Sequence, residues 1–264
     1  MPIVLTMFTM QQIKPYFPPE IRQDEYMLKE YLQYKILHLI FRSKYAYKLV
    51  FIWGTALRIC YHSQRFSEDL DFDNFWLTLL EFEQLSADVK KWLENEWLEV
   101  DIRVIKKWAF HCYIKIPELL YTYDLAPMKT QKILIQIDTA AQWHEYQWEL
   151  MQISKFDTQA LIRVCSPHVL LSMKLYTVFE RKRIKGRDFY DIVFLLWLTR
   201  QPDRSYLEQT LWFTKPAELK DRLLGKCADL DFKKLQADVQ PFLFQPTNQS
   251  VLNFVDFIQH IEFK

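Results

Sequence analysis

Glycine is scarce in this sequence, with only 3 in 264 residues, so each glycine is expected to meet a specific conformational or packing requirement. The four cysteines are far apart and form no CxxC pair, which argues against a zinc site or a disulfide framework. Neither sign of charge dominates, since 34 Lys and Arg residues stand against 33 Asp and Glu residues. Net charge therefore neither favours nor excludes nucleic acid as a partner.

Long hydrophobic runs are also missing. The longest run, Ile192 to Leu198, is far too short to span a membrane. The first 17 residues contain no basic stretch followed by a continuous apolar run, which a signal peptide would show. We therefore expect a cytoplasmic protein without membrane association, and its length allows one large domain or two modest ones.

Hydrophobic periodicity predicts a mixed α/β N-terminal half. Apolar residues recur at helical spacing from Asp24 to about Arg42 and from Leu79 to Trp97, and a shorter helix is expected from Thr55 to Tyr61. Alternation of apolar and polar residues, or short apolar runs next to turn residues, predicts the strands. The expected strands cover residues 48–53, 69–73, 100–105, 110–116 and 132–138.

The C-terminal half is expected to be helical. Ser166 and Pro167 are typical of a helix start, and this helix should run to about Arg183. A second helix is expected from Asp188 to Thr199, followed by several more that are separated by prolines. We place the boundary near residue 155, which gives domains of residues 1–155 and 156–264.

Two aspartates on one predicted strand are the strongest candidates for chemistry. Asp69 and Asp71 are two residues apart, so both side chains should leave the same face of the strand. Converging carboxylates can bind the Mg²⁺ ions that assist phosphoryl transfer. Upstream, backbone N–H groups at Gly54 and the hydroxyl of Thr55 could hold a triphosphate. An isolated Asp-x-Asp is also typical of a solvated strand, but the turn upstream of it makes the pattern more specific.

These residues resemble the nucleotidyltransferase superfamily, and most closely the AbiEii/MenT group of bacterial toxin nucleotidyltransferases. The resemblance is carried by Trp53-Gly54-Thr55-Ala56-Leu57 and by Ser67-Glu68-Asp69-Leu70-Asp71-Phe72. It continues in PHVLLSMKLYTVFERKRIKGRDFYDIVFLL and covers roughly residues 25–200. It implies an α/β (α+β) fold in which helices flank a mixed sheet, with a helical C-terminal domain. Trp53 departs from the group, which has a glycine there, and could narrow the nucleotide pocket or pack into the core.

The resemblance also implies a third acidic residue on a neighbouring strand. Asp138, at the end of the run KILIQID, is the best match, and it would activate the incoming hydroxyl or bind a second metal ion. A strand-end aspartate that caps the following turn is the alternative interpretation. Asp101 is the second candidate for this role, and Asp73 is expected to support the site or to lie on the surface.

A lysine on an apolar helix face is the next candidate. Lys174 shares its face with Leu170, Leu171 and Val178, and burial of an ammonium group requires an anionic partner. The resemblance implies contact with nucleotide phosphates, whereas a lysine whose head reaches the rim is the structural alternative. Asp188 and Asp191 share a helix face and could position Lys174, bind substrate or cap the helix.

The remaining residues are assigned more weakly. We expect nucleotide binding from Gly54, Thr55, Arg58, Arg65, Ser67, Lys174, Arg187, Asp188 and Asp191. Eight basic and two acidic residues between Ser154 and Arg187 form a cluster that could follow an RNA backbone or could be a solvated helix end. The histidines His62, His111, His144 and His168 show no metal-ligand spacing and are expected to be structural or surface residues.

The resemblance implies a metal-dependent nucleotidyltransferase. It would transfer a nucleoside monophosphate from an NTP to RNA, namely the 3′ end of a tRNA, with Mg²⁺ or Mn²⁺ as cofactor. It also implies toxicity that a separate antitoxin protein neutralises. One alternative is a nucleotidyltransferase that modifies a small molecule such as an antibiotic. The other, suggested by Trp53, is a non-catalytic nucleotide-binding protein of the same fold.

Overall fold

The computed structural model describes residues 7–96, 98–142, 145–211 and 216–263. The chain divides into two compact units. The first unit consists of Met1–Tyr61, Phe66–Trp143 and Glu149–Val164, and the second consists of His62–Arg65, His144–Trp148 and Cys165–Lys264. The last segment of the first unit ends at Val164, within about ten residues of the expected boundary near residue 155, because it includes a strand that sequence periodicity did not predict.

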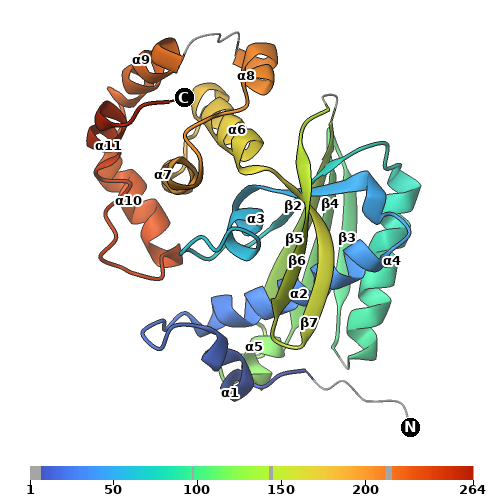
Figure 1. The fold of residues 1–264 in the computed structure, drawn as a ribbon. Helices are drawn as coiled ribbons and strands as arrows, with labels where there is room; N and C mark the ends of the chain where they lie inside the picture. Colours follow the sequence, from blue (N-terminus) through green and yellow to red (C-terminus); the bar gives the residue numbers. More distant parts are fainter. Residues whose placement is uncertain (1–6, 97, 143–144, 212–215, 264) are drawn as a thin grey trace. The chain divides into compact units, whose positions relative to one another are not determined.

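The first unit contains a mixed seven-stranded sheet in the order β3-β4-β5-β2-β1-β7-β6 (Figure 1). Its strands are β1 (Leu49–Ile52), β2 (Leu70–Asn74), β3 (Asp101–Lys106), β4 (Phe110–Pro117), β5 (Lys132–Ala141), β6 (Trp148–Lys155) and β7 (Thr158–Cys165). β2 pairs parallel to β5 and antiparallel to β1, while β4 pairs antiparallel to both β3 and β5. The mixed α/β fold that the sequence predicts is confirmed.

The first unit also contains helices, some of which pack on this sheet. They are α1 (Met10–Ile13), α2 (Asp24–Arg42), α3 (Trp53–Ile59), α4 (Leu79–Asn95) and α5 (Leu119–Thr122), with single 3₁₀ turns at Lys14–Tyr16 and Ala46–Lys48. The bounds of α2 agree with the predicted helix, and α4 begins at the predicted residue, although Trp97 lies outside the described residues. α4 packs on β3 and β4, and α2 packs on β5, so the side chains of β4 and β5 that face them are buried.

The two faces of β4 and β5 therefore differ sharply. Cys112, Ile114 and Ile116 of β4 are buried, whereas the alternate residues between them are partly exposed. β5 repeats the pattern, since Ile133, Ile135 and Ile137 are buried between partly or fully exposed neighbours. Strict alternation of this kind is typical of strands with one face on a core, and the second face is available for polar chemistry.

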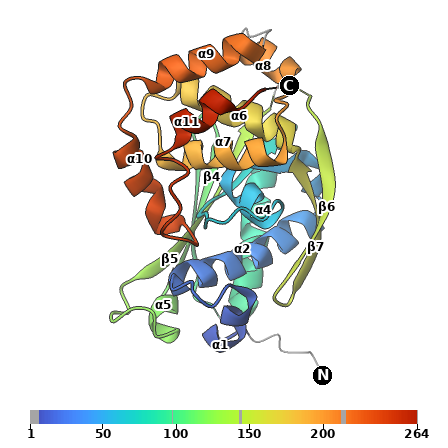
Figure 2. The ribbon, with the colours of Figure 1, turned by 60° about the vertical axis from the view of Figure 1, so that its left-hand side comes forward.

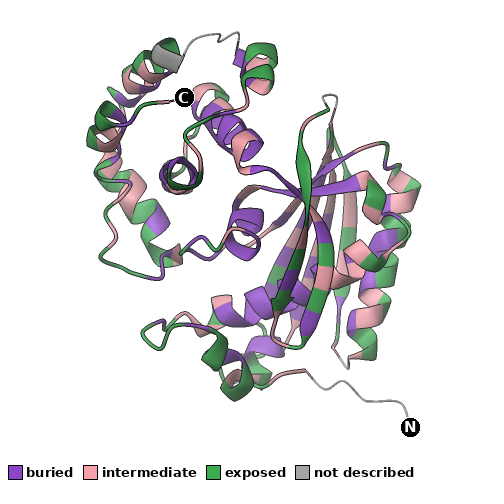
Figure 3. Cartoon of the chain, in the orientation of Figure 1, coloured by how far each residue is buried: buried purple, intermediate pink, exposed green. Residues whose placement is uncertain are grey.

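The second unit is helical, as predicted. Its helices are α6 (Pro167–Glu180), α7 (Gly186–Leu198), α8 (Arg204–Leu211), α9 (Pro216–Cys227), α10 (Phe232–Val239) and α11 (Phe254–His260), with a 3₁₀ turn at Gln240–Phe242. α7 packs against α6 and α10 (Figure 2), and most residues of α6 and α7 are buried (Figure 3). Gly186 is required at the start of α7, because an added Cβ would lie 1.8 Å from the backbone oxygen of Leu235.

Among the described helices, none combines the length and the apolar composition that crossing a membrane requires. The four cysteines are all buried and none forms a disulfide, so they act as small apolar residues of the core.

Candidate active site

Two carboxylates lie side by side at the centre of the sheet. Asp71 of β2 and Asp138 of β5 are register partners in a parallel strand pair. Neighbouring strands are about 4.8 Å apart and partners in register project from the same face, so the two side chains are adjacent. Both residues are partly exposed. The structure thus brings together two of the three carboxylates that the sequence singled out.

Asp69 lies just before β2, so it precedes the strand on which the sequence analysis placed it. Its backbone carbonyl accepts a hydrogen bond from the hydroxyl of Thr55, which ties the start of β2 to α3. β1 ends at Ile52, which is the register partner of Asp71, and α3 begins at the next residue. The turn that contains Gly54 and Thr55 is therefore fixed next to the Asp-x-Asp segment, as the motif order predicts.

Trp53 occupies a backbone conformation that favours glycine. Its φ is 63°, in the left-handed region, and it is the first residue of α3. A side chain in this region costs about 1–2 kcal/mol because Cβ approaches the following carbonyl oxygen. A glycine, which the resemblance leads one to expect at this position, would adopt the same backbone conformation without this cost. In this chain Trp53 is held in a strained turn next to the carboxylates, and its side chain is only partly buried.

Two polar side chains hold the Asp138 carboxylate. Nδ1 of His111, on β4, lies 2.8 Å from Oδ1 of Asp138, and the two residues are register partners. Nε2 of Gln136 donates to both carboxylate oxygens at 2.8 and 2.7 Å. Sequence reasoning missed both partners and treated His111 as an ordinary histidine. The spacing of Gln136 and Asp138 on one strand was a visible signal, whereas His111 requires knowledge of strand register.

The other two acidic candidates, Asp101 and Asp73, are not register partners of Asp71 or Asp138. Asp101 is exposed on β3, which is separated from β5 by β4, and its register partner is Lys115. Asp73 shares the face of Asp71 but is buried, and it accepts a hydrogen bond of 3.1 Å from Nε2 of Gln142. The supporting role expected for Asp73 stays a prediction.

The donor chemistry of the Asp71–Asp138 pair fits a divalent cation. Mg²⁺ in proteins is usually bound by one or two carboxylates and completes its octahedral shell with water and substrate phosphate oxygens. Among the residues that the structure describes, no group of three or more His, Cys, Asp or Glu side chains is arranged to hold a metal ion. The Asp71–Asp138 pair is therefore a candidate two-carboxylate site, whose remaining metal ligands a nucleotide triphosphate and water would supply.

Arg58 and Ser67, both expected to bind nucleotide, have partners inside the first unit. Nε and Nη2 of Arg58 donate to the Glu30 carboxylate at 2.8 and 3.2 Å, and Lys155 pairs with the same carboxylate at 2.7 Å. The net effect of these cations lowers the pKa of Glu30, although burial alone would raise it. The carbonyl of Ser67 accepts a hydrogen bond from Gln33 at 3.0 Å.

A cluster of buried charges occupies the second unit. Asp191 is fully buried on α7, and Arg65 binds its two carboxylate oxygens in a fork, with Nε and Nη2 each at 2.7 Å. Nζ of Lys174 lies 2.7 Å from Asp191 and 3.2 Å from Asp188. Arg181 adds a contact of 2.9 Å to Asp188. Two carboxylates therefore hold Lys174 in place, which is one of the roles that the sequence analysis considered for them.

Electrostatics within the cluster follow from these distances. Burial alone would raise the pKa of Asp191, but Arg65 and Lys174 lower it by more. The pKa of Arg65 rises correspondingly, because Asp191 outweighs the desolvation of the guanidinium. Both groups stay charged, as fork geometry between Arg and carboxylate requires.

Two members of the predicted basic cluster are engaged in ion pairs. Lys155 pairs with Glu30 in the first unit, and Lys174 is buried among carboxylates in the second. The exposed members lie around the α6–α7 connection, namely Arg181, Lys182, Arg183 and Lys185. The guanidinium carbon Cζ of Arg187 lies over the ring of Phe242, 5.0 Å from its centroid. His144 lies outside the described residues.

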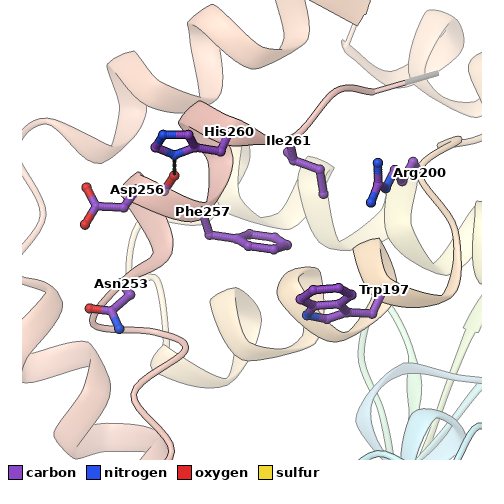
Figure 4. Close-up of a pocket in the computed structure, with 7 residues that line it drawn as sticks. All are labelled: Trp197, Arg200, Asn253, Asp256, Phe257, His260 and Ile261. Atoms are coloured by element: carbon purple, nitrogen blue, oxygen red, sulfur yellow. Dashed lines mark hydrogen bonds between the residues drawn. The ribbon is translucent and has the colours of Figure 1, made fainter.

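The second unit also contains a pocket of about 640 Å³ between the ends of α7 and α11 (Figure 4). Trp197 and Phe257 face each other across it with ring centroids 5.8 Å apart, and Arg200 and His260 lie at its rim. Asp256 is the one carboxylate that lines it. The pocket contains none of the predicted site residues, and it lacks the paired carboxylates that metal-assisted phosphoryl transfer uses.

Comparison with known proteins adds independent findings. Residues 36–252 match the family model described as nucleotidyl transferase AbiEii toxin, type IV toxin–antitoxin system. A search of curated proteins finds no match.

Three solved structures share the fold. A nucleotidyltransferase toxin named MenT4 from Mycobacterium tuberculosis is 17% identical with a TM-score of 0.63, and the alignment covers 97% of this chain and 91% of that one. A putative nucleotidyltransferase from Helicobacter pylori is 18% identical with a TM-score of 0.59, covering 90% and 95%. The protein JHP933 from Helicobacter pylori is 19% identical with a TM-score of 0.58, covering 90% and 92%. Similarity at these identities establishes the fold alone.

Proposed function

Because the chain belongs to the AbiEii family of toxin nucleotidyl transferases, we propose that it transfers a nucleoside monophosphate from an NTP to the 3′ end of an RNA, namely a tRNA. The observation that carries the proposal is the register pairing of Asp71 with Asp138 next to the Gly54–Thr55 turn. Two adjacent carboxylates beside a strand-to-helix turn suit a metal–triphosphate substrate.

Each carboxylate has a distinct role in the proposed reaction. Asp69 and Asp71 would hold the metal-associated triphosphate together with Asp138, whose carboxylate would also accept the proton of the acceptor hydroxyl. The hydroxyl oxygen then bonds to the α-phosphorus, and the bond to the departing pyrophosphate breaks. His111 and Gln136 orient the Asp138 carboxylate for this task through the hydrogen bonds that they make to it. A bound Mg²⁺ or Mn²⁺ would neutralise the charge that develops on the phosphate oxygens.

Binding of metal and nucleotide together should stabilise the protein. A ligand at 100 times its dissociation constant stabilises the native state by about 2.7 kcal/mol. For a chain of this size we expect the melting temperature to rise by roughly 5–10 °C. Differential scanning fluorimetry with each NTP, with and without Mg²⁺ or Mn²⁺, measures the effect.

The rise in melting temperature should require both the metal ion and the NTP. It should shrink in Asp71→Asn, because the two adjacent carboxylates repel each other until a cation is bound. A full rise in Asp71→Asn would place the nucleotide elsewhere. If no NTP stabilises the wild type but one stabilises Trp53→Gly, then Trp53 closes the nucleotide pocket, and the proposed transfer activity of the wild type is wrong.

Lys174 offers a second prediction, which rests on the resemblance. Lys174→Ala should weaken NTP use at least tenfold, the scale of one charge-assisted phosphate contact at about 1.5–3 kcal/mol. In this variant Asp191 still pairs with Arg65, and Asp188 still pairs with Arg181. Neither carboxylate is left unpaired, so the fold should persist. Steady-state kinetics against NTP concentration measure the change. Normal kinetics in the folded fraction would make Lys174 a structural residue.

The acceptor is identified by a direct experiment. Purified protein is incubated with Mg²⁺, each labelled NTP and total tRNA, and in parallel with an aminoglycoside antibiotic. Label that enters tRNA supports the RNA acceptor, whereas label that enters only the antibiotic supports the small-molecule alternative. The type IV toxin–antitoxin description of the family supports a cognate antitoxin and toxicity in the cytoplasm.

A further inference from the structure

A row of aromatic rings runs along β4 next to Asp138. Trp108 precedes the strand, and its ring lies edge-on to His111 with centroids 6.0 Å apart. His111 stacks on Tyr113 with centroids 6.4 Å apart. We call these three residues the aromatic strip. They belong to the first unit, and His111 and Tyr113 stand on the partly exposed face of β4.

Core packing does not account for the strip. The Trp108 side chain is 82% exposed, although an indole usually buries most of its surface. His111 and Tyr113 alternate with Cys112 and Ile114, which fill the core on the opposite face. The rings therefore form a surface feature, and such a feature gains stability chiefly when a partner covers it.

Unpaired cations surround the strip. Arg103 of β3 is the register partner of Tyr113, and Lys115 follows Tyr113 on the same face of β4. Lys106 and Lys107 lie next to Trp108 and are exposed. Within the described part of the chain, none of these four cations forms an ion pair, so their charges are available to phosphate groups. One acidic residue lies near these four cations, namely Asp101, which is the register partner of Lys115.

The strip is continuous with the proposed catalytic carboxylate. His111 is hydrogen-bonded to Asp138 at 2.8 Å, and Tyr113 is the register partner of Gln136, which holds the same carboxylate. A chain of nucleotides that lies along β4 would thus bring its end to Asp138. Aromatic faces combined with free cations are the features by which proteins bind single-stranded nucleic acid.

We infer that the exposed face of β3, β4 and β5 binds the single-stranded 3′ end of the RNA acceptor. Trp108 and Tyr113 stack on its bases, the four cations contact its phosphates, and its terminal hydroxyl lies at Asp138. This inference rests on the proposed function, because it assigns the place of the acceptor in that reaction. It makes Trp108 a determinant of acceptor affinity that has no part in NTP binding.

The test compares two equally exposed tryptophans. Trp108→Ala removes a ring of the strip, whereas Trp76→Ala removes an 83% exposed ring that follows β2 and lies outside the strip. We expect the KM for tRNA to rise about tenfold or more in Trp108→Ala, the scale of one lost base–aromatic stack. The KM for NTP should stay within about twofold, and Trp76→Ala should match the wild type in both constants.

A salt titration provides a second readout that a merely structural role would not change. Binding of a fluorescein-labelled single-stranded RNA is followed by anisotropy at several salt concentrations. Each phosphate contact contributes about 0.7 to the slope of log K against log salt for single strands, so Arg103→Gln combined with Lys115→Gln should lower the slope by about 1.4. An unchanged slope, or equal affinity for double-stranded RNA of the same sequence, would overturn the assignment.

The two proposals fail in distinguishable ways. If the wild type labels tRNA and Trp108→Ala has an unchanged KM for tRNA, the inference is wrong while the proposed function stands. If Mg²⁺ and NTP stabilise the protein but no RNA is labelled, the proposed acceptor is wrong. In that case the anisotropy experiment decides the inference separately, since binding that depends on Trp108 supports it and absence of binding overturns it.

Discussion

Asp71→Asn is expected to abolish nucleotidyl transfer and to leave the fold intact. The substitution is nearly isosteric and removes one of the two adjacent charges that would bind the metal–triphosphate. Loss of one preorganised group of this kind lowers kcat by about 10²–10³-fold, and loss of the cation itself should lower it further. Transfer of label from an NTP to tRNA, measured at saturating substrate, reports the effect. Asp69→Asn should behave alike.

The control is Asp101→Asn, which removes an exposed carboxylate from β3 and should keep full activity. Melting without metal gives a further check. Like charges directly opposite each other on neighbouring strands are destabilising, so Asp71→Asn should melt at or slightly above the wild-type temperature. Full transfer activity in a folded Asp71→Asn protein would remove this residue from the site, and lost activity with a collapsed melting transition would make it structural.

Many helices and strands of the first unit could be predicted from the local spacing of apolar and polar residues. The helical spacing from Asp24 to Arg42 coincides with α2, and the alternation around Asp71 coincides with β2. β6 and β7 were missed because their residues do not alternate clearly between apolar and polar. β6 lies at the edge of the sheet and only Ile153 in it is buried, so its sequence carries little of the pattern that a core imposes.

The residues of the candidate site also fall into two groups, those that the sequence predicts and those that only the structure reveals. Asp69 and Asp71 are visible in the sequence because a strand repeats every two residues. The pairing of Asp71 with Asp138 and of Asp138 with His111 depends on register between strands that are far apart in the chain. Local periodicity contains no information about that register. The resemblance to known toxins supplied Asp138, but it supplied neither His111 nor the strain at Trp53.

The charge cluster of the second unit illustrates the same limit over a longer range. An apolar helix face around Lys174 indicated that the ammonium group needs an anionic partner, and Asp188 and Asp191 supply it. Arg65 is separated from Asp191 by 126 positions, and its assignment to nucleotide binding came without any sign of that contact. Burial of a full Arg–Asp fork is a property of tertiary packing, so only the structure could assign the partner.

Asp191→Asn is expected to destabilise the protein strongly. Arg65, whose side chain is 2% exposed, would lose the charge of the carboxylate that binds it in a fork, and Lys174 would lose one of the two carboxylate charges next to it. Removal of one partner from a buried ion pair costs about 3–5 kcal/mol, because the remaining charge is neither hydrated nor compensated. For a chain of this size the melting temperature should fall by about 10 °C or more. Thermal and urea unfolding at pH 7 measure the loss.

The matched control is Asp188→Asn, which should cost much less. Lys174 keeps its contact of 2.7 Å to Asp191 in that variant, and Arg181, another charged partner of Asp188, is 44% exposed and can be hydrated. A double variant adds a second check. Arg65→Met combined with Asp191→Asn removes both charges of the fork, so its loss should be smaller than the sum of the two single losses. Equal stability of Asp191→Asn and Asp188→Asn would contradict the role of Asp191 as the centre of the cluster.

The same cluster predicts how stability depends on pH. The pKa of Asp191 is lower in the folded protein than in the unfolded chain, since Arg65 and Lys174 outweigh burial. Its contribution to the free energy of unfolding is therefore fully present above the unfolded pKa, about 4 for an aspartate, and is lost as the pH falls through the folded value. The difference in stability between wild type and Asp191→Asn should be constant from about pH 7 to pH 5 and should shrink below pH 4. A difference that stays constant down to pH 3 would mean that packing of the Asp191 side chain, and not its charge, stabilises the second unit.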